Sequence, residues 1–122
     1  MNLGDAFTMA VPPKYDRSHL FFVITDPQKN GGTYHIVNIT TDQLRAGKEC
    51  IIDVGDHAWV RHKSFVSFAD TREINLAKAK KVESLIGTLI TMQPRLKNEV
   101  LQRIIAAGKS SKSIPVGIKR FL

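Results

Sequence analysis

The chain has 122 residues, 43% of them hydrophobic and 24% charged, which predicts one compact domain and argues against two. Its 18 Lys and Arg against 11 Asp and Glu give a net charge of +7, so polyanions are the expected partners. No segment approaches the run of about eighteen apolar residues that a membrane span requires, and the N-terminus lacks the basic and apolar regions of a secretory signal.

Cys50 is the single cysteine and cannot form an internal disulfide. Together with the absence of a signal, this indicates a reducing cytoplasm as the expected location. Within the sequence ECIIDV, Cys50 is predicted to be a small buried hydrophobic residue rather than a reactive thiol.

The first strand is predicted over residues 19–25, HLFFVIT, because this run is dense in aromatic and β-branched residues. DPQKNGG then supplies Asp-Pro and Asn-Gly-Gly, which are typical of a turn. Residues 33–41, TYHIVNITT, resume strand character with apolar groups on both faces. Such a strand is expected to lie within a small barrel or under a helix.

Short strands are predicted next at CIIDV, HAWVRH and KSFVSFA, residues 50–69, and their close spacing favours a barrel. Helices are predicted at residues 73–89 and 94–109, the second with Pro94 in its first turn and Gly108 at its end. The basic tail that follows is expected to form a final strand or an arm on a partner. The prediction is a single mainly β domain, with a barrel core over 18–75, a helical part over 76–108 and a tail over 109–122.

Several kinds of site are poorly supported by the residue pattern. The histidines and aspartates near residues 53–62 lack the spacing of a metal site, so no metal or other cofactor is expected. No Gly-x-Ser-x-Gly elbow is present for acyl transfer. The loop PQKNGGT lacks a nucleotide-binding fingerprint, and it is interpreted either as a plain turn with Lys29 in solvent or as a loop along a nucleic-acid backbone.

Metal-free RNA scission fits the segment from Asp56 to Ser64 better than these chemistries do. In that reaction the substrate's 2′-hydroxyl attacks its own phosphorus, so the enzyme supplies a proton acceptor, a proton donor and a cation. Histidine serves either proton role, and arginine offers paired donors to phosphoryl oxygens. On the residue chemistry alone, however, a turn and a solvated strand face without chemistry is the favoured interpretation. Trp59 is interpreted as a core residue rather than a base-stacking platform.

The order of three motifs, VITDPQKNGG, IVNITTD and GDHAWVRHKSFVSFAD, resembles the PemK/MazF-like toxins of toxin-antitoxin systems over roughly residues 18 to 75. That resemblance implies an SH3-like small β-barrel and cleavage of RNA. It also implies a groove lined by the first-strand loop and the ends of the following strands. In this chain the loop carries Lys29 where the better-studied toxins place an arginine.

The resemblance and the chemistry together predict two groups of site residues. The expected catalytic residues are His57 or His62 for proton transfer, Arg61 as the cation, and Thr41 and Ser64 as phosphate hydrogen-bond donors. The expected nucleic-acid-binding residues are Asp26, Lys29, Thr40, Asp56 and Lys63. The leading hypothesis is a cytoplasmic, metal-independent endoribonuclease toxin acting on single-stranded RNA, dimeric and neutralised by an acidic antitoxin. The alternatives are a non-catalytic small-barrel nucleic-acid-binding module and a protein-interaction adaptor.

Overall fold

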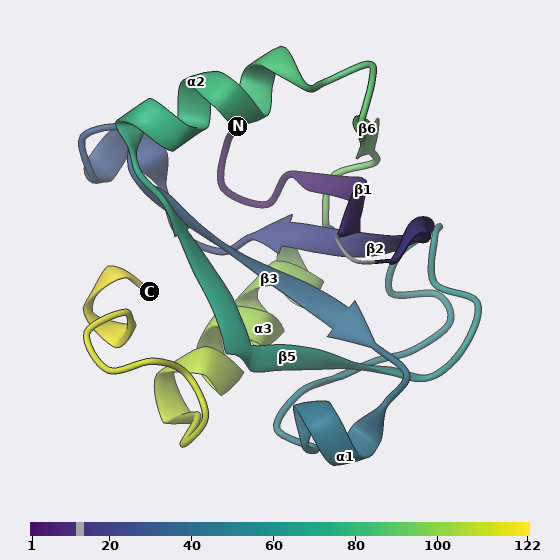
Figure 1. The fold of residues 1–122 in the computed structure, drawn as a ribbon. Helices are drawn as coiled ribbons and strands as arrows, with labels where there is room; N and C mark the ends of the chain where they lie inside the picture. The colour runs from purple at the N-terminus through teal and green to yellow at the C-terminus, as the bar shows by residue number, and fades with distance from the viewer. Residues whose placement is uncertain (12–13) are drawn as a thin grey trace.

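The computed structural model describes residues 1–11 and 14–122, and for residues 11, 14–17, 43 and 45 it describes the backbone alone. In this part of the chain an antiparallel sheet of six strands curls around a helix (Figure 1). Its spatial order is β4-β5-β3-β2-β1-β6. The strands are β1 (Ala6–Val11), β2 (Lys14–Val23), β3 (Tyr34–Thr40), β4 (Ile51–Ile52), β5 (Ser64–Ile74) and β6 (Ile90–Gln93). The prediction of a mainly β fold with helices is confirmed.

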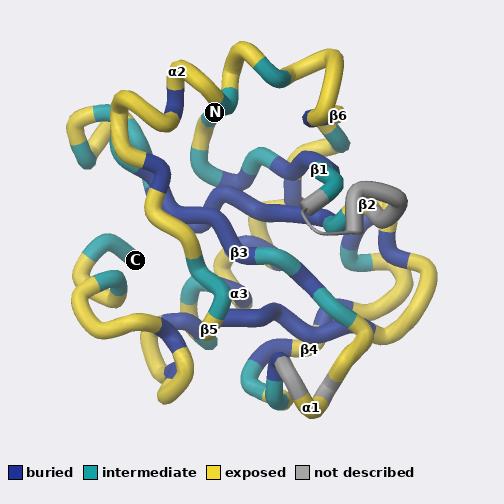
Figure 2. The backbone as a smooth tube through the Cα atoms, viewed as in Figure 1, coloured by how far each residue is buried: buried dark blue, intermediate teal, exposed yellow. Residues whose placement is uncertain are grey.

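The central strands β2 and β3 are buried on both faces because their apolar side chains alternate between two clusters. On β2, Leu20 and Phe22 belong to one cluster, whereas Phe21 and Val23 belong to the other. Figure 2 shows the buried residues concentrated along these strands and β5. The predicted double-sided character of residues 33–41 is therefore confirmed.

A helix covers each cluster. The long helix α3 (Asn98–Ser110) buries Val100, Leu101 and Ile104 against the first cluster, as its apolar spacing predicts. The second cluster lies under α2 (Leu76–Ser84), which contributes Ala79 and remains largely exposed (Figure 2). Both predicted helices exist, although α3 begins four residues after Pro94 and continues two residues past Gly108.

Two strands were missed and one was wrongly predicted. β1 and β6 pair with each other at the far edge of the sheet, and both lie outside residues 18–75. Residues 57–62, HAWVRH, form no strand; a turn closes there through a hydrogen bond of 3.0 Å from the Val60 N–H to the His57 carbonyl. β5 begins only at Ser64. The short helix α1 (Gln43–Ala46) lies in the link before β4.

The C-terminal tail folds back on the domain rather than forming a strand. Ile114 is buried in the first cluster, and Ile118 and Leu122 pack against it. The tail ends in a short 3-10 helix, η2 (Lys119–Phe121), and the Phe121 ring lies 4.9 Å from the His35 ring. Ile114, Ile118 and Leu122 are therefore used within the chain, whereas Val116 is fully exposed. Most of the tail is thus docked on the domain, which gives the prediction of an arm on a partner little support from this geometry.

Candidate functional site

Four of the predicted catalytic residues line one hollow of about 360 Å³ at the ends of β3 and of the loop that precedes β5. They are Thr41, Arg61, His62 and Ser64, and the wall is completed by Ile39, Trp59 and Val60. Residues about twenty positions apart in the sequence meet here because β3 and β5 are antiparallel neighbours, with Thr40 opposite Phe65. The end of one strand therefore lies beside the start of the other.

A turn over residues 57–60 presents the loop side of this hollow. Both ends of the turn are buried: His57 is 5% exposed and Val60 is 4% exposed in the first cluster. The His57 ring also lies 5.9 Å from that of Phe22. Since the ends of the turn are fixed in the core, Trp59 and Arg61 are carried outward.

His57 holds this turn through both ring nitrogens. Its Nδ1 lies 3.0 Å from the backbone nitrogen of Trp59, and its Nε2 lies 2.6 Å from the Pro94 carbonyl oxygen. A backbone N–H can only donate and a carbonyl can only accept, so Nδ1 is the acceptor and Nε2 carries the proton. Because both nitrogens are engaged away from the hollow, His57 is not brought together with His62. The geometry gives His57 a structural position instead of the proton-transfer role predicted for it.

Ser64 is also engaged in holding the loop. Its Oγ donates a hydrogen bond of 2.9 Å to the His62 carbonyl, and the residue is 5% exposed. The hydroxyl must leave this carbonyl before it can donate to a phosphate. Ser64 is therefore better placed to fix the backbone of His62 than to act as the predicted phosphate donor.

The side chains of Thr41, Arg61 and His62 are exposed. Within residues 1–11 and 14–122, no hydrogen bond or ion pair to another described residue occupies any of the three side chains. A guanidinium, an imidazole and a hydroxyl around one hollow can together bind a phosphate and exchange a proton with it.

A second, smaller hollow of about 210 Å³ adjoins the first. The two share Ile39, Thr41, Trp59 and Ser64, and the second adds Ser18, His19, Leu20 and Thr40. We call the pair of hollows the groove. Thr40 reaches it as predicted, with its Oγ1 accepting a hydrogen bond of 3.1 Å from the Asp42 N–H. Ser18 and His19 were not among the predicted site residues.

Trp59 was predicted to be a core residue, and the structure does not place it there. Its side chain is 38% exposed and lines both hollows of the groove. The exposure of Trp59 follows from its place in a turn between His57 and Val60, which are both buried. The periodicity of the sequence did not indicate this exposure, because periodicity applies to strands and helices and this segment is a turn.

The predicted loop residues Asp26 and Lys29 lie elsewhere. They line a separate hollow of about 280 Å³ beside the tail residues Arg120 and Phe121. Asp26 caps the short 3-10 helix η1 (Pro27–Lys29) by accepting from the Gln28 N–H at 2.9 Å. This hollow lies past the C-terminal end of β2, whereas the groove borders Ser18, His19 and Leu20 in the middle of that strand. The two loop residues are therefore not brought together with the other predicted site residues.

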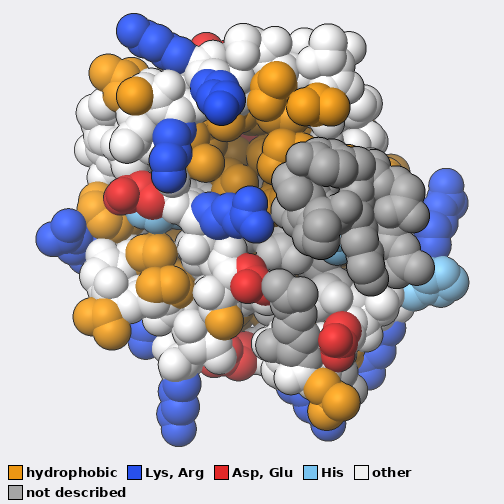
Figure 3. All heavy atoms as spheres, in the orientation of Figure 1, with side chains coloured by type: hydrophobic (Ala, Val, Ile, Leu, Met, Phe, Trp, Pro, Cys, Tyr) orange, Lys and Arg blue, Asp and Glu red, His pale blue; other side chains and the backbone are white. Residues whose placement is uncertain are grey.

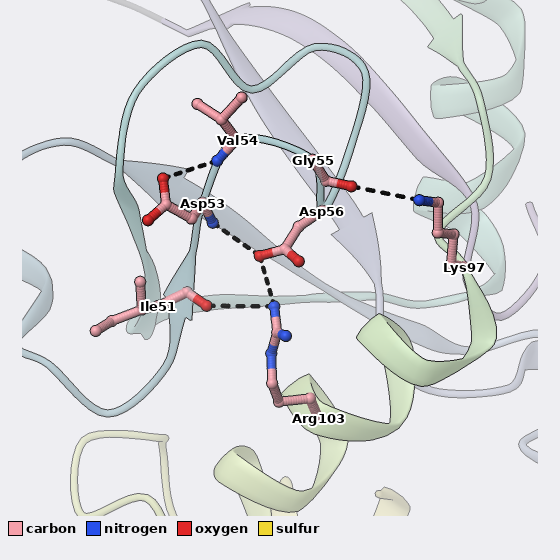
Figure 4. A network of polar contacts seen from close by, with 7 residues as sticks. All are labelled: Ile51, Asp53, Val54, Gly55, Asp56, Lys97 and Arg103. Atoms are coloured by element: carbon pink, nitrogen blue, oxygen red, sulfur yellow. Dashed lines mark hydrogen bonds and ion pairs between the residues drawn. The ribbon is translucent and has the colours of Figure 1, made fainter.

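Asp56 lines neither hollow of the groove, and its side chain points toward Arg103 of α3 (Figure 4). Its carboxylate lies 2.6 Å from an Arg103 guanidinium nitrogen and accepts a hydrogen bond of 2.8 Å from the Asp53 N–H. Lys97 reaches the Gly55 carbonyl at 3.4 Å. These contacts tie the loop that carries the groove residues to α3. Lys63 is exposed and does not line either hollow of the groove.

Cys50 and His35 are among the titratable groups that are buried outside the groove. Cys50 is 5% exposed, which confirms the prediction that it is buried, and burial raises the pKa of its thiol. His35 is fully buried, and burial lowers its pKa even though Glu73 lies 3.4 Å from its Nε2 and opposes the shift. Its Nδ1 lies 2.9 Å from the Thr25 hydroxyl.

The face shown in Figure 3 carries Lys and Arg side chains at several places, with an apolar area between α2 and the sheet. None of the helices in the described ranges is both long and apolar enough to cross a bilayer. No group of three or more His, Cys, Asp or Glu among the described residues is arranged to hold a metal ion. In comparisons with known proteins, no protein-family model matches this sequence, and no curated protein shows significant similarity to it.

Proposed function

We propose that the protein is a toxin of a toxin-antitoxin system that cleaves single-stranded RNA without a metal ion. The observation that carries the proposal is the meeting of Thr41, Arg61 and His62 around the larger hollow of the groove. These are an alcohol, a guanidinium and an imidazole, each without an internal partner among the described residues. They are the kinds of group that scission of a phosphodiester by its own 2′-hydroxyl requires.

In the proposed reaction the 2′-oxygen bonds to phosphorus while the bond from phosphorus to the 5′-oxygen breaks. One proton leaves the 2′-hydroxyl and one joins the 5′-oxygen, giving a 2′,3′-cyclic phosphate and a 5′-hydroxyl. His62 performs one of these proton transfers. Arg61 supports the negative charge that accumulates on the phosphoryl oxygens, and Thr41 donates to one of them. The second transfer falls to water or to His19, the other imidazole that lines the groove.

The test compares two neighbouring cations in cleavage of single-stranded RNA in the presence of a chelator. Arg61→Ala removes a cation from the groove, and the rate is expected to fall by about a hundredfold, the usual loss for one transition-state donor. Lys63→Ala removes a cation that does not line the groove, and the rate is expected to change by less than about threefold. Equal losses in both variants, or no cleavage by the parent protein, contradict the proposal.

The remaining parts of the proposal concern fold family, partners and location. The curled sheet around α3 supports an SH3-like, PemK/MazF-like barrel. The single free cysteine, Cys50, supports action in the reducing cytoplasm. The net charge of +7 supports an acidic antitoxin that occludes the RNA groove. A homodimer is supported by exposed large apolar side chains in the segment that runs from α2 to β6. They are Leu76, Ile86, Leu89 and Met92, each at least 39% exposed.

The second candidate function is a non-catalytic nucleic-acid-binding module. It is favoured by the engagement of His57 and Ser64 in internal hydrogen bonds, which leaves the groove fewer groups for proton transfer. Binding of RNA with steep salt dependence, no cleavage, and no effect of His62→Asn on affinity are the results that select it.

A further inference from the structure

The groove is divided into two compartments by a shared wall. Trp59, Thr41, Ser64 and Ile39 border both hollows, whereas Arg61 and His62 border only the larger one. Thr40 and His19 border only the smaller one. A ligand that occupies both compartments must therefore pass Trp59 and the Thr41 hydroxyl.

The turn presents Trp59 to this wall with little freedom. The backbone N–H of Trp59 is held by His57, and the next residue, Val60, is buried and closes the turn. The indole is nevertheless 38% exposed. A large aromatic ring that is half exposed on a fixed backbone offers contact area at low entropic cost, which is what base-stacking platforms on single-stranded nucleic acids provide.

We propose that the groove binds two consecutive nucleotides of single-stranded RNA, one in each compartment, with a base stacked on Trp59 and the intervening phosphate at Thr41. This inference rests on the proposed function for the identity of the ligand. The phosphate then lies at the wall that both hollows share, with Arg61 and His62 on one side of it. Trp59 is a binding residue in this arrangement and takes no part in proton transfer.

The composition of the chain makes the inference directly measurable, because Trp59 is the only tryptophan. The probes are 2′-O-methyl mononucleotides and dinucleotides, which lack the attacking hydroxyl and stay intact. Dinucleotides are expected to quench the Trp59 fluorescence and to bind at least about tenfold more tightly than mononucleotides. Equal affinity of the two probes, or binding without any change in the fluorescence, overturns the inference.

Substitutions separate stacking from general effects on the fold. Affinity for an end-labelled 2′-O-methyl RNA is measured by fluorescence anisotropy. Trp59→Phe retains an aromatic face and is expected to bind within about threefold of the parent, whereas Trp59→Leu is expected to lose about tenfold or more. Val116→Ala, a fully exposed apolar residue in the tail, serves as the control and is expected to have no effect. Parental affinity of Trp59→Leu overturns the inference.

Failure of the inference and failure of the proposed function give different results. RNA cleavage at the parental rate by Trp59→Leu, with unquenched fluorescence in the parent, overturns the two-nucleotide groove and leaves the ribonuclease proposal in place. Quenching by dinucleotides without cleavage of RNA supports the groove and overturns the catalytic proposal.

Discussion

Replacing His57 tests whether this residue is structural or catalytic. In His57→Ala, the Trp59 N–H and the Pro94 carbonyl both lose their partner, and a buried ring is removed from beside Phe22. Each hydrogen bond contributes about 1 kcal/mol net, and the unsatisfied groups and lost packing add to this. The free energy of unfolding is therefore expected to fall by about 2–4 kcal/mol, measured by urea denaturation.

Two conservative variants divide this loss. In Asn the side-chain oxygen takes the position of Nδ1 and can still accept from the Trp59 N–H. In Gln the side-chain nitrogen takes the position of Nε2 and can still donate to the Pro94 carbonyl. Each variant at His57 is therefore expected to lose about half as much unfolding free energy as alanine, roughly 1–2 kcal/mol.

RNA cleavage, measured where each variant remains folded, completes this test. His57→Asn is expected to retain a rate within about threefold of the parent, whereas His62→Asn is expected to lose about a hundredfold or more, because of these two histidines only His62 transfers a proton. The reasoning is refuted if His57→Asn is as stable as expected but cleaves RNA much more slowly than the parent, with one limb missing from its pH–rate profile. Parental stability of His57→Ala refutes the hydrogen-bonding account of the turn.

Three further predictions concern buried groups outside the groove. Burial lowers the pKa of His35, so the unfolded chain takes up a proton at this residue before the folded chain does, and the free energy of unfolding should fall as the pH drops below about 6.5. The fall should be less steep in His35→Gln, and identical slopes in the two proteins contradict this. Burial raises the pKa of Tyr34 to about 12, so ultraviolet titration should show a phenol that ionises well above pH 10 and that is absent from Tyr34→Phe. The free energy of unfolding should also decline between pH 10 and 12, and complete ionisation of the tyrosines near pH 10 contradicts this. Cys50 should react with a thiol reagent slowly in the native protein and rapidly in urea, and rapid native labelling would show that it is accessible.

Much of the fold could be predicted because the informative patterns are local. The aromatic and β-branched run in β2 and the apolar spacing of α3 each identify their element within a single window of sequence. β1 and β6 have no such signal. β1, in which Thr8 lies among apolar neighbours, is stabilised by pairing with both β2 and β6. The four residues of β6, ITMQ, form a strand because they pair with β1, more than eighty positions away.

The candidate site was predictable in part for the same reason. Arg61, His62 and Ser64 lie within four positions, so any fold that exposes this segment keeps them close. The direction of His57 depends on the Pro94 carbonyl, 37 residues further along the chain, and cannot be read from its neighbours. Lys29 was assigned to the groove because of the family resemblance, in which the loop after the first strand lines the groove. In this chain that loop lies beside the C-terminal tail instead.

The central claim is tested most directly by NMR of the four histidine rings during addition of a 2′-O-methyl dinucleotide. We expect chemical-shift changes for His62, smaller changes for His19, and none for the buried rings of His35 and His57. Shifts confined to His35, or no shift of His62 at saturating dinucleotide, contradict the claim that phosphate chemistry takes place beside Trp59.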